Sequence, residues 1–320
     1  MAFRRRWEYF RTAARWVVAA GLIILIVHHL KIDEFRSIVI APRPGPLALM
    51  VGAGLLFLAM GGLNIWILLS ALSPVRLSRV LRAYLVAASL GSFTPAALGD
   101  FSLVGLLGRE GIPVHQSFAV MLVDRGITLA LYLLVYLPLT AVLILPIGRW
   151  RWLPVAFGAG VAGVLALNVV RPLRLWVRAR IVRPWLPQLE DFLRTGSDLL
   201  RAYPFHLLAD VVVTVARSVV SGVMILMVLA AVGAHADLVR VVIISNVLSL
   251  LNYIPITVGG VGVYEGGAMA LFGQIGLSNE RVFAGFVLLR AYVVVSSLVF
   301  LALARRLVPK RQGARNEVRA

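Results

Sequence analysis

Three arginines lie inside long apolar stretches of this sequence, where a permanent charge needs a specific role. They are Arg125, Arg217 and Arg290. A charged side chain at the centre of a membrane helix costs at least about 2.5–3.5 kcal/mol unless it is paired or faces water. The guanidinium is a planar fork of donors that suits a phosphodiester. We therefore predict that Arg125 and Arg290 bind a phosphate group; the alternative is that each pairs with a carboxylate to fix helix packing.

Three carboxylates, Asp100, Asp124 and Glu265, accompany these arginines in the apolar sequence. Asp124 and Glu265 are candidate partners for the arginines, and all three are the only acid–base candidates if the protein is an enzyme. Neighbouring residues of a helix point about 100° apart, so Asp124 and Arg125 are expected to address different partners. Pairing between a carboxylate of one part of the chain and an arginine of another is therefore open.

The arginines at 125 and 290 belong to a pattern that occurs twice. In both copies a Pro precedes a Gly by four residues, and a later Gly precedes the Arg by fourteen. From the Pro to the later Gly there are sixteen residues in the first copy and twenty-one in the second. A repeat of broken apolar segments that carry ionisable groups is typical of a transporter core. The matched residues are Pro95, Gly99, Gly111 and Arg125, and Pro255, Gly259, Gly276 and Arg290.

Glycines gather beside these anchors, at Gly99 in the first copy and at Gly259, Gly260 and Gly262 in the second. Exposed backbone N–H groups at the start of a helix can cradle a phosphate or cap a carboxylate. Close packing of the backbone at the tip of a hairpin is an equally good interpretation of the same glycines.

The composition is that of a polytopic membrane protein. The 320 residues are 60% hydrophobic and 14% charged, with a mean hydropathy of +0.91, outside the range of soluble globular proteins. A net charge of +18 suggests nucleic acid in a soluble chain, but basic cytoplasmic loops explain it here, so we predict no nucleic-acid partner. The lack of Cys and the spacing of the five His residues predict no disulfide, no metal site and no cofactor.

Six apolar stretches are long enough to cross a bilayer, which takes about 20 helical residues. Two further apolar regions, 80–108 and 239–275, are interrupted by the Pro and Gly residues of the repeat, and we interpret them as re-entrant helical hairpins. The predicted fold is an all-α polytopic membrane protein with an inverted-topology repeat. The six predicted spans are residues 12–30, 46–72, 117–145, 153–170, 205–232 and 282–303.

The distribution of Lys and Arg predicts the orientation in a cell inner membrane. One side carries 22 of these residues and the other 7, so both termini are expected in the cytoplasm. The hairpins then open from opposite sides, which places a shared site near the midplane. Asp210 falls near the cytoplasmic end of its span and is expected at the interface. Arg217, seven residues later on the same helical face, lies deeper and is predicted to line a cavity.

We interpret residues 1–320 as one integral membrane domain. Within it, segment 171–204 carries apolar residues on one helical face; it is either an amphipathic helix on the membrane surface or an ordinary connector. The parts of the domain are an N-terminal two-helix segment (1–73), the first repeat (74–146), connecting helices (147–232), the second repeat (239–304) and a basic tail (305–320).

The chain resembles the lysylphosphatidylglycerol synthase transmembrane-region family, whose members are also called flippase-like integral membrane proteins. The resemblance rests on TPAALGD, the Asp124–Arg125 pair and above all NYIPITVGGVGVYEGG followed by Arg290. It covers nearly the whole chain, without the aminoacyltransferase domain of the full-length synthases. The family implies movement of aminoacylated phospholipids, other lipids or polyprenyl-linked substrates across the bilayer. The departures from the family pattern are Asp100, Thr128 and Val258.

Together these features predict a lipid transporter rather than an enzyme. The protein is expected to bind an amphiphilic lipid with an anionic or polyprenyl-phosphate headgroup in a midplane cavity and to move it between leaflets. A membrane enzyme acting on a lipid headgroup and a non-transporting lipid-binding scaffold are the alternatives, and a homo-oligomer is compatible with the sequence. The predicted binding residues are Arg125, Arg290, Asp100, Asp124, Glu265, Gly259, Gly260, Gly262 and Arg217.

Overall fold

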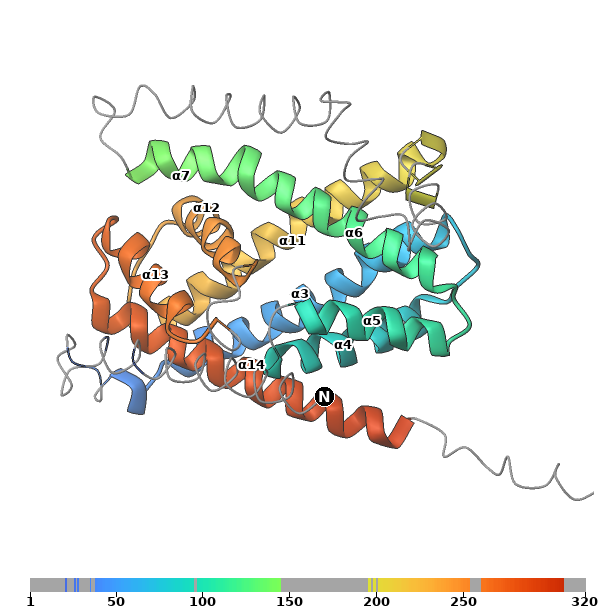
Figure 1. The fold of residues 1–320 in the computed structure, drawn as a ribbon. Helices are drawn as coiled ribbons and strands as arrows, with labels where there is room; N and C mark the ends of the chain where they lie inside the picture. Colours follow the sequence, from blue (N-terminus) through green and yellow to red (C-terminus); the bar gives the residue numbers. More distant parts are fainter. Residues whose placement is uncertain are drawn as a thin grey trace, which may run out of the picture.

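Every regular element in the described part of the chain is helical (Figure 1). The computed structural model describes residues 38–94, 97–144, 201–253 and 260–307, with a few single positions between 21 and 35 and between 195 and 199. The prediction of an all-α fold is confirmed.

Four helices in the described residues are long and apolar enough to cross a membrane. They confirm the spans predicted at 46–72, 117–145, 205–232 and 282–303. The spans predicted at 12–30 and 153–170, and almost all of segment 171–204, lie outside the described residues. The four helices are α3 (Pro44–Ser70), the continuous helix of α6 (Val114–Leu131), the π-helical turn η1 (Tyr132–Tyr136) and α7 (Leu137–Ile144), then α11 (Pro204–Ala231) and α14 (Asn279–Leu307).

Between α3 and α6 the chain forms a hairpin of two shorter helices, α4 (Leu77–Phe93) and α5 (Ala97–Arg109). Their 17 and 13 residues correspond to lengths of about 25 and 20 Å, shorter than a hydrocarbon core of about 30 Å. Gly91 and Gly99 let the two helices approach closely, because a Cβ on Gly99 would lie 2.6 Å from the Cα of Gly91. Pro95, between the two helices, lies outside the described residues.

A second hairpin precedes α14. It consists of α12 (Leu238–Leu248), the 3₁₀-helical turn η4 (Ser249–Tyr253) and α13 (Val263–Gly273). Helices α12 and α13 have 11 residues each, so neither alone is long enough to cross a bilayer. The second half of the molecule therefore repeats the order of the first: a long helix, a hairpin of short helices and another long helix.

The same backbone turn joins the hairpin to the next long helix in both halves. Gly111 and Gly276 have φ angles of 87° and 89°, a conformation that costs little only for Gly. In each turn the N–H of the Gly donates to the carbonyl three residues earlier, and the next N–H donates to the carbonyl five residues earlier. These are two Schellman motifs, so the sequence repeat around the two glycines is also a structural repeat.

The first long helices of the two halves, α3 and α11, cross each other in opposite directions (Figure 1). The N–H of Arg43, at the start of α3, donates to the carbonyl of Ala231, at the end of α11, over 2.8 Å. Near the other end of α3, Asn64 donates to Thr214 in the first half of α11, also over 2.8 Å. The equivalent helices of the two halves are therefore antiparallel.

Each hairpin also packs against the last long helix of the other half. Oγ of Ser297 in α14 donates to Oγ of Ser92 in α4 over 3.1 Å. The hydroxyl of Thr140 in α7 donates to the carbonyl oxygen of Ile243 in α12 over 3.5 Å. The two halves are thus interlocked rather than placed side by side.

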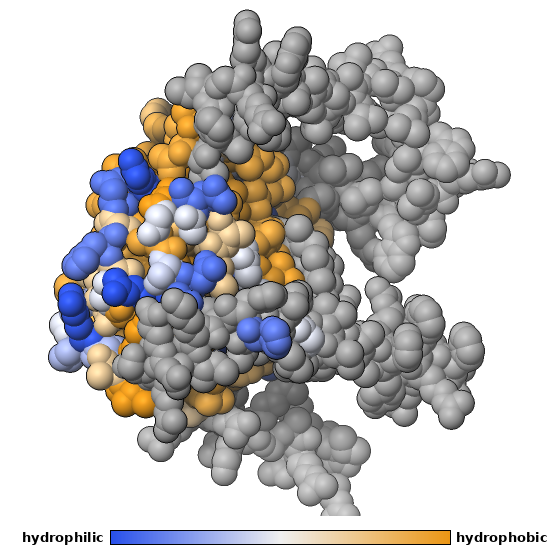
Figure 2. Space-filling model, turned by 90° about the vertical axis from the view of Figure 1, so that its left-hand side faces the viewer, coloured by the Kyte–Doolittle hydropathy of each residue, from blue (hydrophilic) through white to orange (hydrophobic). Residues whose placement is uncertain are grey.

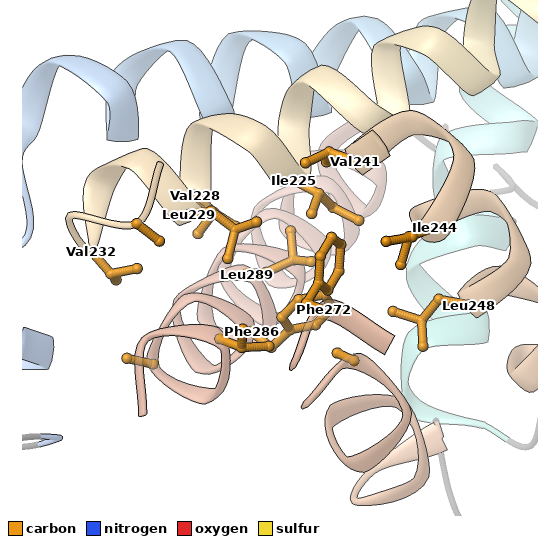
Figure 3. Close-up of a cluster of buried hydrophobic side chains, with 14 of the residues drawn as sticks. Ile225, Val228, Leu229, Val232, Val241, Ile244, Leu248, Phe272, Phe286 and Leu289 are labelled. Carbon is orange, nitrogen blue, oxygen red and sulfur yellow. The ribbon is translucent and has the colours of Figure 1, made fainter. Parts of the chain in front are cut away.

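Buried apolar side chains form two main clusters, one mainly in each half. The cluster of the second half, shown in Figure 3, includes Phe272 and Phe286, and that of the first half includes Leu68 and Leu107. Many large apolar side chains also lie on the outside of the helices. On the face drawn in Figure 2, hydrophobic residues border a patch of hydrophilic ones. An extensive apolar surface of this kind fits contact with lipid.

Candidate functional site

Arg290 on α14 forms an ion pair with Glu265 on α13. The Nη2 and Nε atoms of Arg290 lie 2.6 Å and 3.0 Å from Oε1 of Glu265. The other carboxylate oxygen, Oε2, accepts a hydrogen bond of 2.7 Å from the N–H of Gly262, at the start of α13. The Glu265 side chain is 5% exposed and that of Arg290 is 31% exposed. Glu265 therefore caps α13, ties it to α14 and neutralises the arginine.

This ion pair lies within one half of the molecule, although the sequence left open a pairing between the halves. A signal for the observed pairing was present and was missed. Glu265 and Arg290 are 25 residues apart, and so are Asp100 and Arg125. Asp100 lies on α5, with its side chain outside the described part, and Arg125 is half-buried on α6.

The glycines predicted to bind a headgroup have local structural roles. Gly260 and Gly262 have φ angles of 70° and 84°, so a larger residue is strained at either position. The N–H of Gly262 caps Glu265, which is one of the two roles that the sequence suggested. Gly99 serves the close contact between α4 and α5. Gly259 lies outside the described residues.

Asp124 on α6 faces α3 and binds an amide rather than an arginine. Its Oδ1 accepts a hydrogen bond of 3.3 Å from Nδ2 of Asn64, and the residue is buried. Asp124 and Glu265 were the two carboxylates considered as ion-pair partners for the arginines. Within the described residues only Glu265 takes that role.

Arg217 on α11 has no carboxylate within the ion-pair distance of 4.0 Å in the described part of the chain. Its Nη2 donates to the phenol oxygen of Tyr84 on α4 over 2.8 Å. Its Cζ lies 4.3 Å from the ring centre of Phe57 on α3, a cation–π contact. The Nε atom is buried without an acceptor, while the residue as a whole is half-buried. This guanidinium keeps both its charge and a donor for an anion.

Arg217 lies where the two halves meet. Gly62 of α3 and Gly222 of α11 are 160 residues apart, and each allows its helix to pack closely against the next one. On either one, a Cβ would lie within 3.3 Å of a backbone Cα of the next helix. The same offset of 160 residues relates Phe57 to Arg217, so the arginine stacks on its own counterpart. Contact between equivalent residues marks the axis of a twofold arrangement.

Asp210, expected near the membrane interface, is covered by protein. Its exposed fraction is 0%, and both of its carboxylate oxygens are buried. Thr214, one turn later on α11, contacts Asn64 of α3, so this face of α11 is turned towards protein. The position of a residue along a helix predicts its depth in the membrane, but it does not tell which face is covered by other helices.

Sequence reasoning did not single out Tyr84, Phe57 or Asn64, the side chains that contact Arg217 and Asp124. Asn64 carried a usable signal, because it is the one amide side chain in the apolar helix α3. The two aromatic residues carried none, since nothing in an apolar helix distinguishes a ring that supports a cation from a ring that fills the core.

Comparison with known protein families matches residues 12–300 to the family described as lysylphosphatidylglycerol synthase TM region. The resemblance of the motifs to this family is thereby confirmed. No curated protein and no solved structure matches the chain. The family and the four apolar helices together indicate a multi-pass membrane protein that acts on lipids. Because the match covers nearly the whole sequence, the chain belongs to the lysylphosphatidylglycerol synthase transmembrane-region family.

Proposed function

We propose that the protein binds a membrane lipid with a phosphate-containing headgroup near the middle of the bilayer and moves it between the leaflets. The observation that carries this proposal is Arg217, a half-buried guanidinium at the crossing of α3 and α11 without a carboxylate partner in the described residues. A permanent charge inside a membrane span needs an anion or water. A lipid phosphodiester supplies both the negative charge and acceptor oxygens.

Arg217, rather than Arg290, has the central role in this proposal. Arg290 is already neutralised by Glu265, so a phosphate bound there would displace a buried carboxylate. Arg217 interacts with the neutral side chains of Tyr84 and Phe57. A phosphate can therefore add charge-assisted hydrogen bonds to Arg217 without breaking an existing ion pair.

The ion pair of Glu265 with Arg290 is proposed to fasten the second hairpin to the span that follows it. An equivalent pair of Asp100 with Arg125 in the first half is suggested by the shared spacing of 25 residues. Opening one pair while the other stays closed would give Arg217 alternating access to the two sides, as the rocking of an inverted repeat requires.

The arrangement in the membrane is proposed to consist of six spans and two re-entrant hairpins, with both termini in the cytoplasm of a cell inner membrane. The antiparallel crossing of α3 and α11 supports an inverted repeat. Cysteine labelling is clean here because the chain has no native Cys. Ser278→Cys is expected to react from outside, and Val75→Cys and Lys310→Cys only from the cytoplasm; labelling of position 310 from outside would contradict the arrangement.

Proteoliposomes that contain a headgroup-labelled fluorescent phospholipid test the function directly. Arg217→Ala is expected to lose most lipid movement, whereas Arg217→Lys keeps part of it, because an ammonium retains the charge but not the planar fork. Arg79→Ala is the matched control. It removes the same charge from an exposed pair with Glu110, 3.8 Å away, and should move lipid like the wild type. Wild-type movement in folded, monodisperse Arg217→Ala would overturn the proposal.

The same preparation separates the two alternative functions. An enzyme acting on a headgroup changes the mass of the lipid, which mass spectrometry of the extracted lipids detects. A lipid-binding scaffold retains the labelled lipid without changing its leaflet. Movement without a change of mass is the result expected here, and we propose no catalytic residue and no cofactor.

A further inference from the structure

Two helices of the first half, together with α11 of the second, place five polar side chains in the interior of the molecule. None of the five is more than 4% exposed. We call them the buried polar cluster, and they are Asn64 on α3, Asp124 and Thr128 on α6, and Asp210 and Thr214 on α11.

Contacts join three of the five side chains, and helical spacing places the other two on the same faces. Nδ2 of Asn64 donates to Oγ1 of Thr214 over 2.8 Å and to Oδ1 of Asp124 over 3.3 Å. Thr128 lies one helical turn after Asp124, and Asp210 lies one turn before Thr214, so the members of each pair share a helical face. The polar faces of α6 and α11 therefore meet at Asn64.

Four oxygen atoms of the cluster are buried without a hydrogen-bond partner among the described residues. They are both carboxylate oxygens of Asp210, Oδ1 of Asn64 and Oγ1 of Thr128. A buried polar atom left unsatisfied costs about 1–3 kcal/mol, and a buried charge costs more. One hydrogen-bond donor satisfies one or two of these oxygens, whereas a bound cation contacts several at once.

The charges around Asp210 leave one negative charge to be balanced. Burial disfavours the charged form of Asp210 and the Asp124 carboxylate repels it, whereas the Arg217 guanidinium attracts it; the other members of the cluster are neutral. Because Arg217 forms no ion pair with either carboxylate, the cluster carries negative charge that a bound cation neutralises. A site built only of oxygen atoms selects a hard cation. Among the described residues, no group of three or more His, Cys, Asp or Glu side chains is placed to hold a metal ion, so a cation here depends on the neutral oxygens as well.

The second half shows that the fold does not need polar residues at this junction. Equivalent residues are offset by 160 for α3 and α11, as between Gly62 and Gly222, and by 165 for α6 and α14, as between Gly111 and Gly276. Three of the five counterparts belong to the apolar cluster of the second half or pack against it; the other two, Gly54 and Val293, carry no polar side chain either. The polar residues therefore serve a purpose other than packing. The counterparts of Asp210, Asn64 and Asp124 are Met50, Met224 and Leu289.

We propose that the buried polar cluster binds one Na⁺ ion. Asp210 and Asp124 supply the negative charge, and the amide oxygen of Asn64 and the hydroxyl of Thr128 are neutral ligands. A protonated Asp210 donates a single hydrogen bond and so satisfies one of the other oxygens, whereas a cation contacts several at once, so the set of four oxygens favours the metal ion. The sequence predicted no metal site, because ligands on three separate helices form no motif.

Purified protein in detergent provides the first test. Thermal unfolding is measured in NaCl and in choline chloride at equal ionic strength, and Na⁺ is expected to raise the unfolding temperature in a saturable way, because it binds the folded state. Binding of ²²Na⁺ is expected to saturate at about one ion per chain, as one neutralising charge implies. Neither measurement involves lipid movement, so the Na⁺ site and the proposed function can fail independently.

Three variants sharpen the test. Asp210→Asn is expected to abolish ²²Na⁺ binding and the Na⁺-dependent shift. Thr128→Val keeps the side-chain shape and removes one ligand, so it should bind Na⁺ about tenfold more weakly, a loss of about 1.4 kcal/mol; it answers the question if Asp210→Asn fails to fold. Glu110→Gln removes an exposed carboxylate and should bind like the wild type.

Two results would overturn the Na⁺ site. The first is the absence of saturable ²²Na⁺ binding in folded wild-type protein, including the case in which stability depends on pH and not on Na⁺, which would assign a proton instead. The second is Na⁺ binding of wild-type strength in folded Thr128→Val and in folded Asp210→Asn, which would place the ion elsewhere.

Discussion

In the second half of the molecule, α11, α3 and α14 meet in an apolar core, whereas in the first half α3, α11 and α6 meet around the buried polar cluster. Phe286 and Leu289 pack with Ile225 and Leu229 in the apolar core (Figure 3). Its counterpart holds two carboxylates and an amide, with four oxygen atoms that have no partner in the described residues. The Schellman turns and the close helix crossings are alike in the two halves. The difference lies in the side chains.

This difference separates what the fold requires from what a ligand requires. A junction of Met and Leu side chains holds three long helices together in the second half. The first half places charged groups at the same junction, although burying an ion costs several kcal/mol. The two halves therefore share the same backbone arrangement. The energetic cost of burying polar groups arises only at the junction of α3, α11 and α6.

The largest loss of stability is expected when a carboxylate is placed in the apolar core. Met50→Asp puts an acid at the counterpart of Asp210, among side chains that are apolar except for the phenols of Tyr264 and Tyr292. We expect a loss of about 3–5 kcal/mol in the free energy of unfolding, because the charge stays uncompensated. Thermal unfolding and the yield of monodisperse protein measure it. Met50→Leu, which conserves volume, should lose less than about 1.5 kcal/mol. Equal stability of the two variants would show that the core can accommodate a charge or water.

The reverse exchange gives the polar junction the residue of the apolar one. Asp210→Met replaces the buried carboxylate with the side chain found at position 50. In the absence of Na⁺, we expect it to stabilise the protein by about 1–4 kcal/mol, as when a buried ion gives way to apolar packing. Unfolding in choline chloride measures the gain. A destabilised Asp210→Met variant would mean that the carboxylate has a partner within the fold.

The smallest effects are expected where the two halves are alike. Gly111→Ala and Gly276→Ala each place a Cβ on a residue with positive φ, which costs about 1–2 kcal/mol. The two losses, measured by unfolding under one set of conditions, should agree within about 0.5 kcal/mol, the usual scatter of independent sites. Gly105→Ala on α5 meets no atom within 4 Å and serves as a control that should not destabilise. Clearly unequal losses at the two turns would weaken the structural repeat.

The sequence predicted the long helices and the repeat well, because each depends on local information. Predominantly apolar segments of 27 and 28 residues mark α3 and α11, since a bilayer requires helices of that length. Gly111 and Gly276 were matched through their spacing to Arg125 and Arg290, and both form the same turn. Spacing along the chain was sufficient for these features.

The candidate site could be predicted only in part, because it depends on which helix faces meet. Arg217 was placed among the binding residues, but its contacts with Tyr84 and Phe57 come from two other helices. Asp210 was expected at the interface, since nothing in its own segment shows that α3 covers it. Such contacts are set by the crossing of α3 with α11, which no pattern within a single helix encodes.

The interlocking of the two halves has a consequence for biosynthesis. Ser92 in the first hairpin binds Ser297 of α14, so a helix made early is completed by one made more than 200 residues later. Membrane helices insert one by one and associate afterwards. The first hairpin therefore lacks its contact with α14 until that helix has been synthesised and inserted. A chain interrupted before α14 lacks contacts in both halves, and quality control should treat it as unassembled rather than as half a protein.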